Sequence, residues 1–330
     1  MDRAGPQISV VIAAWNAAAT IGHAIDSVLA QQGVTVEVIV VDDASTDNTL
    51  DLAREVASRD ARVIVLAQPL NRGPAAARNR ALDAARAPYV ALLDSDDAMG
   101  PTRLGELLEM ARAGDWDMVA DDLYKVTSHA PTAPRQRLLG DRKIGLETID
   151  FQGFVRGNLS RLHGGRGEMG FLKPLMRKEF LDRHGLRYDE TMRLGEDYAL
   201  YATALARGAR FCLTDPRGYL ALVRPDSLSG RHSAADLAAL VGADHALADE
   251  PGLSRADRQM LRAHEIETQK RWRWVRLIEA VKARDAGDAL RCFRAPPAVV
   301  VDLVGKLSEQ VVLRSLAAIR RRDLAGSGDR

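Results

Sequence analysis

The sequence has little of what marks secreted, membrane-spanning or nucleic-acid-binding proteins. Its only cysteines are Cys212 and Cys292, which provide neither a disulfide framework nor the ligand spacing of a zinc site. No uncharged apolar run approaches the roughly 18 residues that a membrane span needs. The first six residues lack the basic-then-apolar pattern of a signal peptide. These absences predict a cytoplasmic protein in a reducing compartment.

Net charge is almost absent as well. The chain has 46 Lys+Arg against 45 Asp+Glu, so the formal charge of +1 gives no basic excess to attract nucleic acid. Hydrophobic residues make up 46% and charged residues 28%, which is typical of a globular protein and excludes wholesale disorder. At 330 residues the chain is long enough for one large domain with an appendage.

Apolar β-favouring runs alternate with helical patterns over the first 122 residues. Such alternation predicts βαβ units and a mostly parallel, Rossmann-like sheet flanked by helices. Ligands bind beyond the carboxyl ends of the strands of such a sheet, so the residues that follow each strand are the first candidates for a site. The predicted strands are 8–14, 36–41, 62–66, 89–93 and 117–120, and the predicted helices are 17–32, 47–58, 74–86 and 101–113.

The remainder of the chain divides into two parts. Residues 125–162 show no clear period and are interpreted as loops and short elements, whereas 171–184 is ordered and 194–208 is a helix. Beyond residue 234 the pattern is almost wholly helical. We therefore expect a catalytic domain over 1–233, with halves at about 1–122 and 123–233, and a helical extension over 234–330.

Two acidic clusters follow predicted strands and fall at one edge of the sheet. Asp94-Ser95-Asp96 has the form Asp-any-Asp, which suits Mg²⁺ or Mn²⁺ because these ions favour one or two carboxylates plus substrate phosphates. The alternative is an acidic loop in which Asp97 caps the next helix. Asp43 follows the second strand, where its carboxylate can accept hydrogen bonds from a base and a ribose. Its segment 42–47 is also typical of a capping turn.

Three further segments carry candidate site residues. Arg78 lies one turn into the helix that begins at Pro74, where its guanidinium can contact a base or phosphate or simply be solvated. Glu196-Asp197 opens a helix whose dipole stabilises carboxylates, and one of the pair can act as a general base. The loop 224–233 is rich in donors and is either a solvated loop or a clamp over a diphosphate.

Together these segments resemble family 2 of the glycosyltransferases, which are inverting enzymes with the GT-A fold. The resemblance covers residues 6–233 and rests on motifs that occur in the family's order. Segments 170–178 and 183–190 resemble bacterial exopolysaccharide enzymes of the succinoglycan type, which add glucose to a lipid-linked oligosaccharide. The family motifs lie at 8–16, 40–47, 71–73 with 77–79, 92–97 and 195–197.

The resemblance implies a role for each matching residue. Asp197 is the general base, Glu196 is its neighbour or an acceptor ligand, and Asp96 holds Mg²⁺ or Mn²⁺. His232 is a second expected metal ligand because of its place in the loop 224–233 and not because of the resemblance. The donor is a nucleotide sugar, expected to be UDP-glucose, and the acceptor a lipid-linked glycan. Asp43 contacts the uracil or ribose, Arg78 supports the base and Asp94 touches the ribose. The expected nucleotide-sugar-binding set is Ala13, Trp15, Asp43, Arg78, Asp94, Ser95, Arg224 and Arg231.

The sequence departs from the family pattern after its first strand. Ala13 and Ala14 stand where Pro or a hydroxyl residue is usual, and Trp15 stands where Tyr is commoner. A hydroxyl contact to the nucleotide is therefore lost there. A nucleotidyltransferase would need a glycine- and lysine-rich phosphate loop, which residues 15–19 do not provide. A non-catalytic nucleotide-sugar-binding subunit would be expected to lack the acid pair at 196–197.

Charge is unevenly distributed along the chain. Residues 255–330 carry a formal charge of +7 and residues 1–254 a charge of −6. Trp272 and Trp274 lie among basic residues, a pattern typical of helices at a membrane interface. We expect 255–330 to contact an anionic membrane, at the inner face of the plasma membrane. The alternative is that these helices pack on the catalytic domain.

Overall fold

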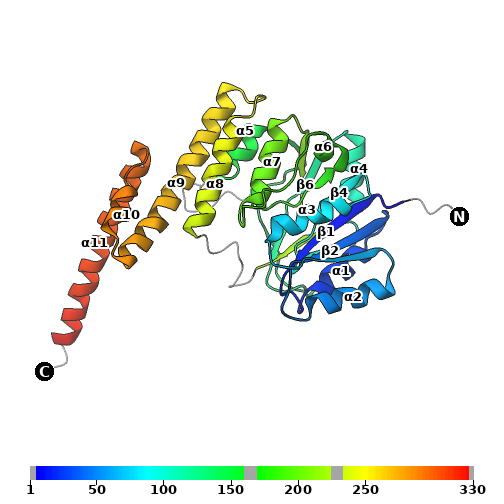
Figure 1. Cartoon of the computed structure of the whole chain (residues 1–330), viewed down its shortest axis with the longest axis horizontal. Coiled ribbons are helices and arrows are strands. Elements are labelled where there is room, and N and C mark those ends of the chain that lie inside the picture. Colours follow the sequence, from blue (N-terminus) through cyan, green and yellow to red (C-terminus); the bar gives the residue numbers. More distant parts are fainter. Residues whose placement is uncertain (1–4, 160–168, 224–232, 327–330) are drawn as a thin grey trace.

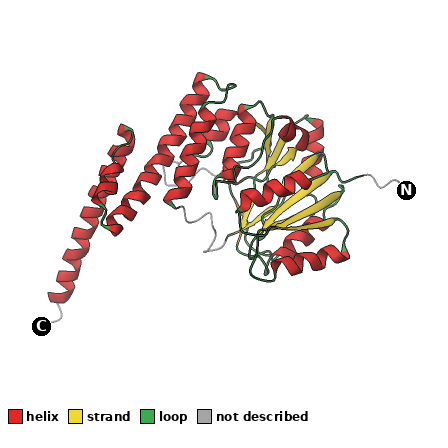
Figure 2. Cartoon of the chain, in the orientation of Figure 1, coloured by secondary structure: helices red, strands yellow, loops and turns green. Residues whose placement is uncertain are grey.

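The computed structural model of the chain describes residues 5–159, 169–223 and 233–326 (Figure 1). The expected ligands Arg224, Arg231 and His232 lie outside these ranges. Helices cover both faces of a central sheet, and further helices continue from one side of this body (Figure 2). The fold class predicted from the sequence is confirmed: a mostly parallel sheet flanked by helices, with a helical extension.

The central sheet has eight strands in the order β3-β2-β1-β4-β10-β6-β11-β9. Strands β3, β2, β1 and β4 are mutually parallel, as are β6 and β11, whereas β10 and β9 run antiparallel to their neighbours. The bounds are β1 Ile8–Ala14, β2 Val36–Asp42, β3 Val63–Ala67, β4 Tyr89–Leu92, β6 Met118–Asp121, β9 Leu146–Ile149, β10 Leu175–Arg177 and β11 Phe211–Thr214.

A smaller sheet lies beside the acidic turn that follows β4. Its order is β5-β12-β7-β8, with bounds β5 Ala98–Met99, β12 Tyr219–Leu222, β7 Tyr124–Val126 and β8 Gln136–Arg137. Asp97 does not cap the next helix. Its carboxylate accepts hydrogen bonds from the hydroxyl of Tyr219 and the backbone N–H of Leu222, each at 2.8 Å, and so joins the turn to β12.

Alternate residues of the strands face two separate cores. Val10, Ile12 and Val38 pack with α1, α2 and α4 on one face, while Val11 and Ile39 pack with α3, α5, α6 and α7 on the other. This is the period of two expected of strands buried on both faces. The bounds are α1 Ile21–Leu29, α2 Thr49–Arg59, α3 Pro74–Ala84, α4 Arg103–Ala113, α5 Phe151–Arg156, α6 Lys178–Arg183 and α7 Glu196–Ala206.

The first helix is shorter than the predicted 17–32. Ala17 and Ala18 precede it, because their backbone N–H groups donate to side chains of the next loop and the start of α2: Thr49 Oγ1 at 2.7 Å and Asp47 Oδ2 at 3.1 Å. This pairing binds the loop after β1 to the loop after β2. It therefore fixes the edge of the sheet at which the predicted site lies.

Strand β10 was not predicted as a strand, only as part of an ordered stretch. It has three residues and lies antiparallel between β4 and β6. Because it runs in the opposite direction, the segment that precedes it lies at the edge where β1, β2 and β4 end. This segment contains Lys173 and follows a short 3₁₀ helix, η1 Met169–Phe171.

The helical extension begins against the catalytic core. Its helices are α8 Ala234–Ala248, α9 Arg255–Ala283, α10 Ala286–Arg291 and α11 Pro297–Gly326. Capping boxes at Ser233 and Ser254 start α8 and α9. Leu240, Leu247 and Leu261 are buried in the same core as α5 and α7. Helix α11 reaches away from this body (Figure 1).

Candidate active site

A cavity of about 430 Å³ opens at the edge of the sheet where β1, β2 and β4 end. Its wall comes from the loops after these strands, the start of α3, the segment before β10, the start of α7, and helices α8 and α9. The position agrees with the general rule for parallel sheets. The cavity brings together the predicted residues Ala13, Trp15, Asp43, Arg78, Asp94, Ser95, Asp96, Glu196 and Asp197.

Trp15 lies at one end of the cavity with 52% of its surface exposed. The next residue, Asn16, has a positive φ of 50°, and its side chain accepts a hydrogen bond from the backbone N–H of Thr46 at 2.8 Å. Its own N–H donates to Ser45 Oγ at 3.0 Å. These bonds hold the loop that carries the indole, which leaves a large aromatic surface open to a ligand.

Asp43 is buried beside this end of the cavity and organises the loop before α3. Its Oδ1 accepts from Gln68 Nε2 and the backbone N–H of Arg72, and its Oδ2 accepts from the backbone N–H of Gly73, all at 2.8 Å. A carboxylate offers about four lone-pair sites, so one remains for a ligand. Gly73 has φ of 90°, a conformation that favours glycine.

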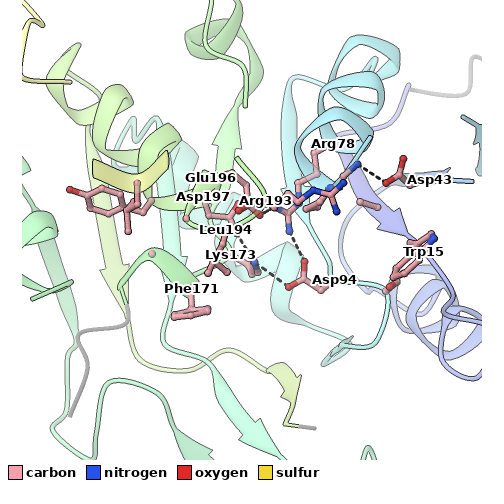
Figure 3. Close-up of a pocket in the computed structure, with 18 of the residues that line it drawn as sticks. Trp15, Asp43, Arg78, Asp94, Phe171, Lys173, Arg193, Leu194, Glu196 and Asp197 are labelled. Carbon is pink, nitrogen blue, oxygen red and sulfur yellow. Dashed lines mark hydrogen bonds and ion pairs between the residues drawn. The ribbon is translucent and has the colours of Figure 1, made fainter. Parts of the chain in front are cut away.

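Arg78 is buried between Asp43 and the acid pair Glu196-Asp197, with its guanidinium among carboxylates (Figure 3). Its Nη1 lies 2.5 Å from Glu196 Oε1 and 3.3 Å from Asp197 Oδ1, and its Nη2 lies 2.9 Å from Asp94 Oδ1. The sequence suggested that this guanidinium supports the base. The structure gives it three acidic partners instead, and contact with a base stays a prediction.

Lys173 is a site residue that the sequence reasoning missed. Its buried ammonium lies 2.7 Å from Asp197 Oδ2 and 3.2 Å from Asp94 Oδ2. Two cations, Lys173 and Arg78, thus connect the turn after β4 to the start of α7 (Figure 3). The only available signal was its position inside segment 170–178, which resembles exopolysaccharide enzymes.

Burial and neighbouring charges shift the pKa values of the acids in this region in different directions. Burial opposes ionisation of Asp94, but Lys173 and Arg78 outweigh it and lower its pKa to about 2. Burial raises the pKa of Glu196, and the negative charge of Asp197 adds to this effect while Arg78 opposes it. Burial also raises the pKa of Asp97 well above its usual range, and the negative charges of Asp94 and Asp96 add to this increase. Asp94 and Glu196, which both line the cavity, thus have pKa values shifted in opposite directions, as is typical of an active site.

Gly195 places the acid pair at the start of α7. It is the N-cap residue with φ of 81°, and an added Cβ would lie 3.0 Å from Leu240 Cδ1 of α8. Helix α8 therefore packs directly over the turn that presents Glu196 and Asp197. The positive end of the helix dipole stabilises both carboxylates at this position.

Asp96 is the described residue best suited to hold a divalent cation. It lines the cavity, whereas both oxygens of Asp94 already pair with cations. Within the described ranges no three His, Cys, Asp or Glu side chains form a metal-binding group. Mg²⁺ and Mn²⁺ do not require one, because a single carboxylate can hold the ion together with the phosphates of a substrate and several waters. The residues present thus fit a cation shared with a diphosphate.

Comparison with known proteins identifies the chain's family. A family model described as glycosyl transferase family 2 matches residues 9–182. The succinoglycan biosynthesis protein ExoU of Rhizobium meliloti (strain 1021) is 41% identical over 307 residues, which span 92% of this chain and 88% of that protein. The chain belongs to glycosyltransferase family 2. Of the three hypotheses that the sequence left open, membership selects the sugar transferase.

Solved structures confirm the GT-A fold of this family 2 glycosyltransferase. TarS 1–349 of S. aureus in complex with UDP-GlcNAc superposes with a TM-score of 0.62 at 17% identity, covering 86% of this chain and 89% of that one. The mannosyltransferase PcManGT of Pyrobaculum calidifontis, in complex with GDP-Man and Mn²⁺, gives 0.56 at 17% identity, covering 92% and 87%. At this identity, both structures show that the chain shares their fold.

The buried cation Lys173 makes the stability of this glycosyltransferase depend on pH in a way that can be tested. Replacing Lys173 by Met removes one of the two cations that Asp94 and Asp197 share and leaves them with Arg78 alone, which should cost up to about 3–5 kcal/mol of unfolding free energy at neutral pH. It should also raise the pKa of Asp94 from about 2. The lowered pKa stabilises the folded wild type above the unfolded value of roughly 4, and this contribution is lost as the pH falls toward about 2.

Urea unfolding of wild type and Lys173→Met from pH 7 to pH 2 measures this effect. The difference between their unfolding free energies should be largest near neutral pH and shrink below pH about 4. Lys282→Met, at an exposed position of α9, is the matched control and should change little. A difference that stays constant over this range contradicts the proposed pairing.

Proposed function

We propose that this enzyme transfers glucose from UDP-glucose to a hydroxyl group of a lipid-linked glycan, with inversion at the anomeric carbon. One observation carries the proposal: the acid pair at the start of α7 faces the Asp94–Asp96 turn across a single cavity. The donor and acceptor classes rest on the resemblance to succinoglycan-type enzymes, and ExoU carries that pathway in its name. UDP-GlcNAc in the TarS complex supports a uridine nucleotide.

The two ends of the cavity suit the two parts of a nucleotide sugar. The exposed indole of Trp15 offers a stacking surface to a base, and Asp43 retains a lone-pair site for the uracil or ribose. Asp94, Ser95 and Asp96 follow β4 between this end and α7. The sugar then lies between the turn and the acid pair. This arrangement brings its anomeric carbon within reach of an acceptor held beside Asp197.

Asp197 removes the proton from the attacking acceptor hydroxyl. Its two oxygens contact Lys173 and Arg78, which hold the carboxylate in place as it becomes protonated. The new bond forms at the anomeric carbon while the bond to the diphosphate breaks on the opposite face, so an α-linked donor gives a β-glycoside. Glu196, paired with Arg78, fixes the guanidinium. No covalent sugar intermediate is required, because the diphosphate is already an activated leaving group.

A divalent cation completes the proposed donor site. Bound Mg²⁺ or Mn²⁺ stabilises the negative charge that develops on the departing diphosphate. Asp96 is its ligand among the described residues, and His232 remains a predicted ligand. Arg224 and Arg231 remain predicted contacts to the diphosphate.

Replacing Asp197 by Asn tests the base. The variant should bind UDP-glucose as wild type does but lose transfer by roughly 10²- to 10⁴-fold, because the amide cannot accept the proton. Calorimetry measures binding, and release of UDP with and without acceptor extracts measures turnover. Asp26→Asn, at an exposed position of α1, is the control. Near wild-type transfer by Asp197→Asn would show that another group is the base.

Replacing Asp96 by Ala tests the cation site. Wild type should bind UDP-glucose more tightly as Mg²⁺ or Mn²⁺ is added, and a chelator should abolish this gain. In Asp96→Ala the gain should disappear while binding without metal changes little. Titrations of UDP-glucose with and without MnCl₂ measure both quantities. An unchanged metal dependence in the variant would remove Asp96 from the cation site.

We propose further that the far end of the extension contacts an anionic membrane surface. Within the described ranges, no helix is both long and apolar enough to cross a membrane. Trp272 and Trp274, which suggested the contact, are half-buried; Arg273 lies over the ring of Trp272, and Trp274 packs on a small cluster with Leu277. The exposed candidates lie elsewhere: the apolar Val281, Leu290, Val301 and Val304 and the basic Lys282, Arg284 and Arg294.

Charge reversal tests this contact without removing α9, whose buried face belongs to the core. The triple variant Lys282→Glu, Arg284→Glu, Arg294→Glu should bind phosphatidylglycerol-containing vesicles at least roughly 100-fold more weakly, since each basic residue near such a surface contributes about 1 kcal/mol. Co-sedimentation with these vesicles and with pure phosphatidylcholine measures binding. Arg54→Glu on α2 is the control. Equal sedimentation of wild type and triple variant would exclude this surface.

A further inference from the structure

One face of α9 lines the cavity with polar side chains. His264, Glu267, Thr268 and Arg271 follow the spacing i, i+3, i+4, i+7, which places them on a single helical face. A helix that only packs against a domain places apolar residues on such a face. Here His264 and Thr268 are buried polar residues instead. The face of α9 that borders the cavity is therefore polar, unlike an ordinary packing face.

A hydrogen-bonded group fixes α9 against the catalytic helix. Tyr198 donates from its hydroxyl to Asp244 Oδ1 at 2.9 Å, and His264 Nδ1 lies 2.8 Å from Asp244 Oδ2. The rings of Tyr198 and His264 stack with centroids 4.4 Å apart. Because Tyr198 directly follows Asp197, the polar face of α9 is held close to the proposed base. All three side chains are buried, so this spacing is rigid.

Arg271 extends this face of α9 into the cavity. Within the described part of the chain, its guanidinium has no carboxylate at ion-pair distance, whereas Arg78 has three. Glu267, one turn earlier, pairs with Lys270 at 2.6 Å. Arg271 is half-buried, and burial lowers its pKa. A partly buried guanidinium without a counter-ion favours the binding of an anion, to which it donates in a fork.

The position of α9 distinguishes this anion from the donor's diphosphate. The nucleotide end of the cavity is formed by the loops after β1 and β2, whereas α8 and α9 lie on the far side of α7 from these strands (Figure 1). The acceptor must approach Asp197 from a side that the donor leaves free. The polar face of α9, adjacent to Tyr198, is such a side.

We propose, on the basis of the transferase function above, that α9 forms the acceptor wall of the cavity and that Arg271 binds an anionic group of the acceptor. Two parts of a lipid-linked glycan carry such a group: the diphosphate next to the lipid, and a carboxylate on an acidic sugar. Both accept a forked pair of hydrogen bonds from a guanidinium. His264 and its partners act as positioning residues for this wall.

Calorimetric titration of the full chain, saturated with UDP, separates the two sources. The probes are farnesyl diphosphate against farnesol, and octyl β-glucuronide against octyl β-glucoside. Wild type should bind at least one anionic probe more tightly than its neutral partner. Arg271→Gln should weaken that binding by roughly ten- to a hundredfold, and Arg271→Lys should retain part of it. Arg262→Gln, an exposed arginine of the same helix, should match wild type.

Each outcome decides the proposal. Loss confined to farnesyl diphosphate supports a lipid diphosphate, and loss confined to the glucuronide supports an acidic sugar. No preference for either anion in wild type, or equal binding by wild type and Arg271→Gln, overturns it. Weaker UDP binding by Arg271→Gln also overturns it, because the residue would then serve the donor. Failure of wild type to bind UDP or any nucleotide sugar instead contradicts the proposed function, and unfolding midpoints verify that the variants are folded.

Discussion

Five buried or partly buried charges hold the active site together. Arg78 of α3 and Lys173 before β10 lie between Asp94 after β4 and the pair Glu196-Asp197 of α7. Removing one partner of a buried ion pair leaves an uncompensated charge, which is far more costly than a lost surface contact. The acids proposed to act on substrate are thus positioned by the same cations that make their burial tolerable. Local stability and the geometry of the chemistry cannot be changed independently here.

The helical extension belongs to the site as well as to the core. Leu240 packs over Gly195, and Asp244 and His264 complete a hydrogen-bonded group with Tyr198. The predicted boundary at residue 233 follows a real change in sequence pattern, from mixed elements to helices. Nevertheless, Leu247 and other apolar residues of α8 and α9 share the core of α5 and α7. The change of sequence pattern near residue 233 thus marks where the chain becomes wholly helical, but the hydrophobic core continues across it.

Much of the fold and the donor side of the site could be predicted from sequence, because continuous apolar runs identify buried parallel strands and the strand ends identify the ligand edge. Lys173 could not be found this way, since it precedes a three-residue strand that has no period and runs against its neighbours. Nor does a sequence show which carboxylates an arginine such as Arg78 will meet. Trp272 and Trp274 illustrate a third limit: basic and aromatic residues side by side look the same whether they face lipid or pack within a helical pair.

The cavity has walls that are encoded at opposite ends of the chain. The loops after β1, β2 and β4 all precede residue 100, whereas the polar face of α9 lies beyond residue 260. The family model ends at residue 182, before both α7 and α9. Two proteins can therefore match it equally well while differing along the whole second wall. The match to the family model depends on the residues of the first wall. Sequence changes in α9 can therefore alter the shape of the cavity without changing that match.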